Sequence, residues 1–196
     1  LEEVGIERLS FGNRENNTPG TGDGDYDTPG TGAYQMHASC AVVFTHVVNG
    51  WARELKSYRP PVNSRDVHLL SNGVCLTFSR QLTITGAELR NPQYKGEGGN
   101  GYLFVFQSND SLITQSSAIN GRHNYSFSLP WCSGNVLHRS AAKDSRLPVD
   151  FHQKLSMANL LDNVTVDGDS LEGKLRSCCD HGHGTTQSVF WNTNGL

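Results

Sequence analysis

The chain has no marked excess of charge of either sign. Its 196 residues include 16 Lys and Arg against 19 Asp and Glu, which gives a formal net charge of -3 at pH 7. Lys and Arg are not gathered into an arm or a stripe, which would be the electrostatic signature of a protein that binds nucleic acid. The sequence therefore predicts no nucleic-acid partner.

Long hydrophobic runs are also missing. The longest uninterrupted apolar run near the start is Ala41-Val-Val-Phe44, whereas a membrane-spanning helix needs about 20 apolar residues. We therefore predict no membrane span. The chain begins at Leu1 with neither a Met nor a charged-then-apolar leader, as expected of a processed chain.

Recognisable catalytic motifs are absent from the sequence. There is no Gly-x-Ser-x-Gly, and the glycine-rich run Gly96–Gly101 is not followed by the Lys-Ser/Thr pair of a phosphate-binding loop. Ser, His and Asp are plentiful, but no motif fixes their relative positions. We expect a non-enzymatic protein, and a metal- or Ser-dependent enzyme is the alternative.

What the sequence does contain is the two-residue rhythm of β-strands. From Val74 to Thr85 the even positions are mainly apolar and the odd positions mainly hydroxylated, with a bend or break expected near Ser79–Gln81 because Arg80 falls in the apolar phase. The 21 glycines suit many tight turns. We predict an all-β chain, folded as an antiparallel β-sandwich of the jelly-roll or Ig-like type.

One segment has helical periodicity. Phe151, Leu155, Ala158 and Leu161 recur at helical spacing behind a capping Asp150, so at most one short helix is predicted near residues 150–162. Residues 1–33 are expected to form an N-terminal strand or arm and a loop rich in Pro, Gly, Thr and Asp. Residues 34–196 are expected to form a single sandwich domain.

Acceptor motifs for N-linked glycans indicate an extracellular, secreted glycoprotein. Four Asn-x-Ser/Thr sequences occur, at Asn16, Asn109, Asn124 and Asn163. The five cysteines agree with an oxidising compartment, and the disulfide candidates are Cys40, Cys75, Cys132, Cys178 and Cys179. An odd count leaves one thiol unpaired or paired with another chain.

Two segments are candidates for metal binding. Asp23, Asp25 and Asp27 alternate with other residues as in the opening of a calcium loop, so Ca²⁺ is the one cofactor that the sequence indicates, although the bidentate Glu of an EF-hand is missing. His181 and His183 form a His-x-His pair that zinc or copper could use with a third ligand. The plainer interpretation is a solvated acidic turn and exposed imidazoles.

The leading functional hypothesis is a structural or adhesive glycoprotein that self-assembles through strand contacts into a homo-oligomer or filament. The first alternative is a lectin-like carbohydrate-binding module, assisted by calcium, with a glycan ligand on exposed aromatic residues. Its aromatic candidates are Trp51, Tyr94, Trp131 and Trp191. The second alternative is a trimeric cytokine-like jelly roll.

Overall fold

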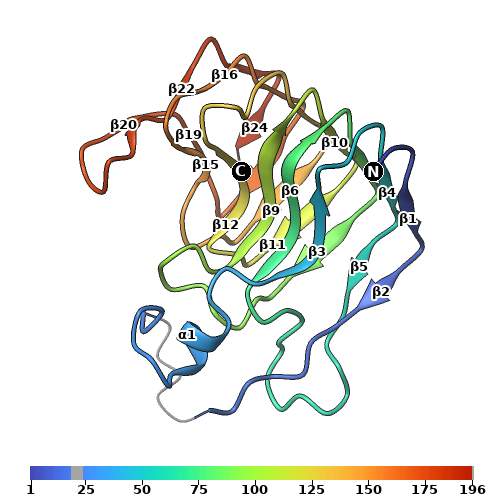
Figure 1. Ribbon diagram of the computed structural model, residues 1–196, viewed down its shortest axis with the longest axis vertical. Helices are drawn as coiled ribbons and strands as arrows, with labels where there is room; N and C mark the ends of the chain where they lie inside the picture. Colours follow the sequence, from blue (N-terminus) through green and yellow to red (C-terminus); the bar gives the residue numbers. More distant parts are fainter. Residues whose placement is uncertain (19–23, 196) are drawn as a thin grey trace.

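The computed structural model describes residues 1–18 and 24–195, which are built mainly of short strands around one hydrophobic core (Figure 1). The only helix among these residues is α1 (Gly32–Gln35), which Thr31 caps by accepting from the backbone N–H of Tyr34. No helix in this described part of the chain has the length and apolar character needed to cross a bilayer.

Three sheets, which we call A, B and C, carry the fold. Sheet B consists of β1 (Gly5–Glu7), β4 (Trp51–Arg53), β7 (Thr83–Thr85), β10 (Leu112–Thr114), β13 (Val136–His138), β17 (Leu160–Asp162) and β23 (Val189–Trp191), in that order. Sheet C consists of β2 (Ser10–Phe11), β5 (Lys56–Ser57), β8 (Glu88–Arg90), β11 (Ser117–Ile119), β14 (Ala141–Lys143), β18 (Thr165–Asp167) and β24 (Asn194–Gly195). Sheet A consists of β3 (Cys40–Thr45), β6 (Asn72–Arg80), β9 (Tyr102–Asn109), β12 (His123–Ser128), β15 (Val149–Gln153) and β19 (Leu171–Glu172).

Within each of these sheets every strand is parallel to its neighbours. The chain visits sheets B, C and A in turn and then starts again one strand further along. This winding is a parallel β-helix, in which each coil packs against the coil before and after it. Two minor pairs stand outside it, β16 (Ser156–Met157) with β22 (Thr185–Thr186) and β20 (Leu175–Arg176) with β21 (Gly182–His183).

The predicted antiparallel sandwich is therefore wrong, although the strand content was expected. Alternation of apolar and polar residues reports that one face of a strand is buried, but it does not report the direction of the neighbouring strand. The segment from Val74 to Thr85 illustrates this. It is two strands, β6 and β7, in two different sheets, and the chain turns between them at Gln81, which has a φ of 56°.

Corners of this kind recur once per coil. Between sheets B and C each coil has one residue with a φ between 46° and 65°, and these residues are Arg8, Glu54, Gly86, Gln115, Arg139, Asn163 and Asn192. A left-handed backbone at a single residue redirects the chain between two short strands. Only one of the seven is a glycine, so the corners have no uniform residue type.

The core consists of rows of apolar side chains that run along the coil axis. Strand register places Ile6, Ala52, Ile84, Ile113, Leu137, Leu161 and Phe190 in one row of sheet B. Sheet A contributes the row Phe44, Leu76, Phe106, Phe127 and Phe151. The rings of Phe106 and Phe127 stack with centroids 4.4 Å apart, so the parallel register itself produces aromatic stacking.

The helix predicted near residues 150–162 is also wrong. This segment forms β15, β16 and β17, in which Phe151 and Leu161 point into the core from different sheets. Leu155 and Ala158 have φ values of 58° and 53°, which no α-helix accommodates. Leu155 and Ala158 are exposed, so only Phe151 and Leu161 of the four residues with helical spacing belong to the core.

Residues 1–33 are not separate from the rest of the fold. β1 and β2 are the first strands of sheets B and C, and they pair with β4 and β5. Residues 24–31 lead to α1, which lies below the strands of sheet A in Figure 1, near the start of β3. The structure therefore places the predicted arm inside the same β-helix as residues 34–195.

Candidate functional site

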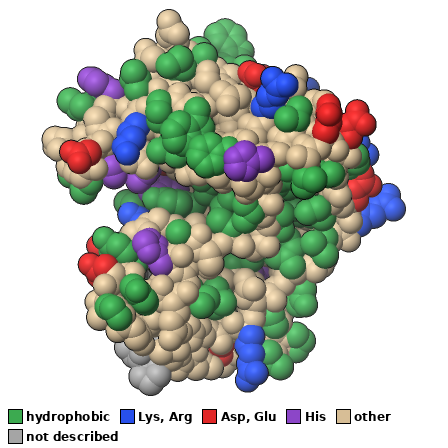
Figure 2. Space-filling model, in the orientation of Figure 1, with side chains coloured by type: hydrophobic (Ala, Val, Ile, Leu, Met, Phe, Trp, Pro, Cys, Tyr) green, Lys and Arg blue, Asp and Glu red, His purple; other side chains and the backbone are tan. Residues whose placement is uncertain are grey.

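A polar cleft of about 710 Å³ lies on the outer face of sheet A. Its floor comes from β6, β9, β12 and β15, and its sides come from the loop before α1, the glycine-rich loop near residue 98, and the loop that contains Cys179 and His181. Figure 2 shows the molecule hollowed on this side, with histidine side chains at the margins.

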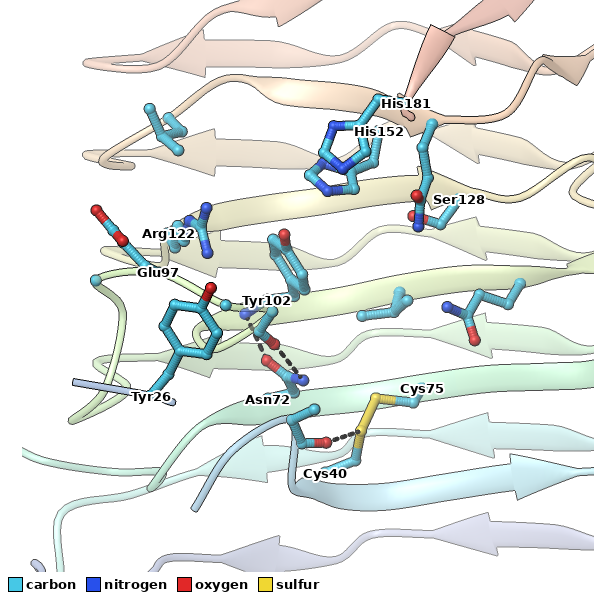
Figure 3. A pocket seen from close by; sticks show the side chains of 18 of the residues that line it. Tyr26, Cys40, Asn72, Cys75, Glu97, Tyr102, Arg122, Ser128, His152 and His181 are labelled. Atoms are coloured by element: carbon cyan, nitrogen blue, oxygen red, sulfur yellow. Dashed lines mark hydrogen bonds between the residues drawn. A yellow bond between two sulfur atoms is a disulfide. The ribbon is translucent and has the colours of Figure 1, made fainter. Parts of the chain in front are cut away.

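The disulfide Cys40–Cys75 closes one end of the floor, and it confirms two of the predicted disulfide candidates. It joins β3 to β6, and Cys75 packs with Tyr102 and Val105 in a small apolar cluster on the outer face. Asn72 links the floor to the side wall, because its side chain accepts from the N–H of Tyr102 at 2.8 Å and donates to the carbonyl of Gly99 at 3.0 Å (Figure 3). This end of the cleft is thus rigidly connected.

The wall beside α1 depends on Gly98. This residue has a φ of 65°, and a Cβ atom there would lie 2.1 Å from the ring of Tyr26. The imidazole of His37 contacts the carbonyl of Gly98, and Tyr26 packs against His37 with ring centroids 5.2 Å apart. A side chain at position 98 would therefore push Tyr26 away from the cleft.

A buried charge network underlies the opposite end. Asp150 is fully buried, and its Oδ2 accepts from Nδ1 of His152 and from Nη2 of Arg176, both at 2.9 Å. Arg176 also donates to Oε1 of Glu172 at 2.6 Å. Burial opposes ionisation of Asp150, but the neighbouring His123, His152 and Arg176 favour it, and the pKa of the carboxyl is below its ordinary value. Arg176 is the permanent counter-charge, because a guanidinium stays protonated.

The hydrogen bonds of this network define the state of two imidazoles. Nδ1 of His152 faces the carboxylate of Asp150, so it is the donor, and Nε2 of the neutral ring is free to accept. Nδ1 of His123 lies 2.6 Å from the carbonyl of Pro148 in the same way, and its Nε2 is buried with no hydrogen-bond partner among the described residues. Burial lowers the pKa of His123. His181 covers His152, with ring centroids 4.8 Å apart.

Tyr102 lies near Arg122 and His152 on the floor of the cleft (Figure 3). Its ring centroid is 4.9 Å from that of His123 and 5.7 Å from that of His152. Burial raises the pKa of Tyr102 to about 12, and nearby Arg122 opposes part of this rise. The phenol therefore keeps its proton at neutral pH.

Arg122 lines the cleft without an acidic partner. Its guanidinium carbon lies 5.7 Å from the centroid of the Tyr102 ring. Its Nε and Nη1 are buried, and neither makes a hydrogen bond to any described residue. By contrast, Arg146 donates to the carbonyls of Lys95 and Gly96. Arg176 is paired with two carboxylates, although its Nε is also buried without a partner among the described residues. Within the described part of the chain, Arg122 is thus the arginine lining this cleft that has neither an ion pair nor a side-chain hydrogen bond.

Metal binding at this network would require rearrangement. His123, Asp150 and His152 offer ligand atoms within 4.8 Å of one another. However, the Asp150 oxygen that contacts His152 also accepts from Arg176, and a cation there would lie against the guanidinium. The donor set therefore fits a hydrogen-bonded charge network better than a metal site.

Of the residues predicted to bind calcium, Asp23 lies outside the described residues, and Asp25 and Asp27 lie in the loop before α1, where the carbonyl of Asp25 accepts from Oγ1 of Thr31 at 2.7 Å. His181 reaches the cleft, but His183 is exposed in β21. The imidazole beside His181 is that of His152, with ring centroids 4.8 Å apart.

The predicted glycan acceptors differ in accessibility. Asn163 is exposed at a corner, and Asn16 and Asn109 are half-buried. Asn124 is fully buried and donates to the carbonyl of Lys143 and to Asp169, so its amide is engaged inside the folded chain. Asn16 accepts from Thr18 of its own acceptor motif.

The remaining cysteines and the predicted aromatic platform lie apart from the site's chemistry. Cys132 is a buried free thiol, and Cys178 and Cys179 are exposed free thiols, of which Cys179 lines the cleft. Trp51 donates to Glu7, Tyr94 is buried in the fold, Trp131 stacks on Phe78, and Trp191 is exposed on β23. The aromatic residues that line the cleft are Tyr26 and Tyr102 instead.

Sequence reasoning missed the residues of the charge network. One signal was available: Asp150 and His152 are two residues apart, so on a strand they share a face. The helical interpretation of the same segment concealed it. Arg122 and His123 lie just before and at the start of β12, and nothing in the sequence indicates that coils further along would cover them.

The fold and the site together define a class, a parallel β-helix with a polar cleft on the outer face of one sheet. Comparison of the chain with protein-family models, with curated proteins and with solved structures finds no match. The functional argument therefore depends on the chemistry of the cleft.

Proposed function

We propose that the protein binds an anionic polysaccharide in the cleft on sheet A. The observation that carries this proposal is Arg122, a guanidinium that lines the cleft and forms no ion pair with any described residue. A carboxylate, sulfate or phosphate group on a ligand would supply the missing counter-charge.

The rest of the lining suits a carbohydrate chain. Side-chain amides and hydroxyls on the floor, from Asn72, Thr77, Gln107, Ser128 and Gln153, match the hydroxyl groups of sugars. Tyr26 and Tyr102 add aromatic surface. A cleft of about 710 Å³ falls in the range of ligand sites. This proposal keeps the predicted glycan ligand but places it on different residues.

The function of a self-assembling structural or adhesive glycoprotein stays a prediction. Secretion, glycosylation and a cytokine-like function also stay predictions. No feature of the cleft requires self-assembly. An unpaired arginine in a polar cleft is explained by an anionic ligand, and this is why glycan binding leads here.

Isothermal titration with acidic and neutral polysaccharides tests the proposal. We expect binding of uronate-containing chains that weakens with salt and no binding of neutral chains such as dextran. Arg122→Gln should weaken binding about tenfold to hundredfold, since a hydrogen bond to a charged group contributes about 1.5 to 3 kcal/mol. The matched control is Arg53→Gln, because Arg53 lies on sheet B with a side chain that is 59% exposed. Equal affinity of Arg122→Gln and the unmodified protein, or equal binding of neutral chains, would refute it.

A further inference from the structure

We propose that the cleft also cleaves its ligand, by β-elimination at a 4-linked uronate whose H5 and O4 lie on the same face of the sugar ring. His152 removes the proton, Tyr102 protonates the leaving oxygen, and Arg122 holds the carboxylate. This inference rests on the proposed function, because it takes the anionic group bound by Arg122 to be the carboxylate of a uronate. It departs from the prediction of a non-enzymatic protein.

His152 has the arrangement of a general base. It lines the cleft, its Nδ1 is held by Asp150 at 2.9 Å, and its free Nε2 can accept a proton. The side chain of His152 is 14% exposed and that of Asp150 is 0% exposed, so the imidazole reaches the cleft while its carboxylate partner does not. A buried carboxylate behind an imidazole both orients the ring and stabilises the imidazolium that forms.

Tyr102 has the arrangement of a general acid. Its phenol lines the cleft and lies beside His152, with ring centroids 5.7 Å apart. Burial, the main cause, raises the pKa of Tyr102 to about 12, so the phenol carries a proton to donate. Such a group is a poor base at neutral pH, which assigns the base to His152 and the acid to Tyr102.

The reaction is balanced without a further reactant. Nε2 of His152 takes H5, and the electrons of the C5–H bond form the C4–C5 double bond. The C4–O4 bond breaks, its electrons go to O4, and the Tyr102 hydroxyl gives O4 a proton. The proton on His152 then returns to the phenolate through the adjacent solvent. Arg122 stabilises the charge that develops on the carboxylate during removal of H5.

Hydrolysis of the glycosidic bond fits the cleft less well. Glycoside hydrolysis by protein carboxylates uses a pair of Asp or Glu side chains that flank the bond. Glu97 on the glycine-rich loop is the one acidic side chain among the described lining residues, and the nearby Asp150 and Glu172 are both paired with Arg176. One unpaired carboxylate does not make the pair that hydrolysis requires. Proton abstraction by His152 requires no such pair.

The positions of the general acid and the general base also restrict which uronates can react. Tyr102 on β9 and His152 on β15 both rise from the outer face of sheet A, so they approach a bound sugar from the same side. Removal of H5 and O4 from one side requires both to lie on that face, as they do in D-glucuronate and D-mannuronate. In D-galacturonate and L-guluronate they lie on opposite faces. We therefore infer specificity for the first pair.

The test incubates the full chain with polymannuronate and hyaluronan, and with polygalacturonate and polyguluronate as comparison polymers. Near-ultraviolet absorbance detects the unsaturated sugar, and mass spectrometry distinguishes elimination, which adds no water, from hydrolysis. We expect unsaturated products from the first two polymers only. Comparable product from polygalacturonate would overturn the one-sided geometry, and hydrolysed product would overturn the elimination.

Two variants assign the roles, and titration separates catalysis from binding. His152→Gln and the near-isosteric Tyr102→Phe should each lower the rate at least about hundredfold, as expected for loss of a general acid or base, while affinity changes little. His138→Gln and Tyr58→Phe are the controls, because both residues lie away from the cleft. Binding of acidic chains without any product would defeat this inference and leave the proposed function standing. Failure to bind any acidic chain would defeat both.

Discussion

Nδ1 of His152 donates to Oδ2 of Asp150 at 2.9 Å, although Asp150 has no exposed side-chain surface. The same carboxylate oxygen accepts from Arg176 at 2.9 Å. One buried oxygen thus joins the cleft to Arg176 of β20. The Asp150 carboxylate stabilises the buried network, and it also orients the His152 ring. These two roles lead to separate predictions.

Asp150→Asn should destabilise the protein by about 3 kcal/mol, because removing one partner of a buried ion pair leaves the other charge uncompensated. Urea unfolding followed by circular dichroism measures this change. Asp162→Asn is the control, since Asp162 and its partner His138 are each 31% exposed and lie 4.0 Å apart. Its effect should stay within about 0.5 kcal/mol. Equal effects of the two substitutions would show that the Asp150 network adds no stability.

Glu15 gives the chain a specific response to acid. Its carboxylate accepts from the N–H and the hydroxyl of Ser64 and from Arg65, and these hydrogen bonds, with the Ser64 N–H first, lower the pKa of Glu15 from 4.5 to about 2. As pH falls, Glu15 is therefore protonated in the unfolded chain before it is protonated in the folded chain. The stabilisation is fully present above about pH 4.5 and is lost progressively toward pH 2.

We expect Glu15→Gln to flatten the fall in unfolding free energy between pH 4.5 and 2, the interval that the two pKa values bound. Urea unfolding at a series of pH values measures the slope. The control is Glu54→Gln, because the Glu54 side chain is 65% exposed and its contact with Arg8 is at the surface. A slope that Glu15→Gln leaves unchanged would mean that the acid response comes from other carboxyls.

Asn135 and Asn159 form an internal ladder between successive coils. Nδ2 of Asn135 donates to Oδ1 of Asn159 at 3.0 Å and to the carbonyl of Ser108 at 2.8 Å, and both asparagines are buried. Asn135→Ala should cost about 2 to 3 kcal/mol, because it leaves buried acceptors unpaired. Chemical unfolding provides the measurement, with Asn17→Ala at an exposed position as the control. A cost no larger than that of Asn17→Ala would show that water replaces the ladder.

The same two asparagines show what the sequence could and could not reveal. They stand 24 residues apart, as do Leu137 and Leu161 in sheet B, so a repeat was present. Ile84 and Ile113 are separated by 29 residues, and Ile6 and Ala52 by 46. Loops inserted at the corners change the period from coil to coil, and the short loop duplication Thr-Pro-Gly-Thr-Gly is unrelated to it. Such insertions leave the strand patterns recognisable in the sequence. They hide the regular repeat that distinguishes a β-helix from a sandwich.

The cleft was harder to predict than the strands because its residues come from different coils. Tyr102, His123 and His152 lie on β9, β12 and β15 and meet only through parallel register. An antiparallel model would pair these strands differently and separate the rings. The disulfide between Cys40 and Cys75 was within reach, since both residues fall in strand-like runs, whereas the choice of partner depended on β3 lying next to β6.

That disulfide supports the last prediction. Linking residues 35 positions apart should contribute about 3 to 4 kcal/mol by restricting the unfolded chain. The double substitution Cys40→Ala with Cys75→Ala should lower unfolding free energy by that amount, and dithiothreitol should destabilise the unmodified protein but not this variant. Cys178→Ser with Cys179→Ser is the control, because both thiols are exposed and free. If reductant acted equally on the unmodified protein and the Cys40/Cys75 variant, another sulfur linkage would be responsible.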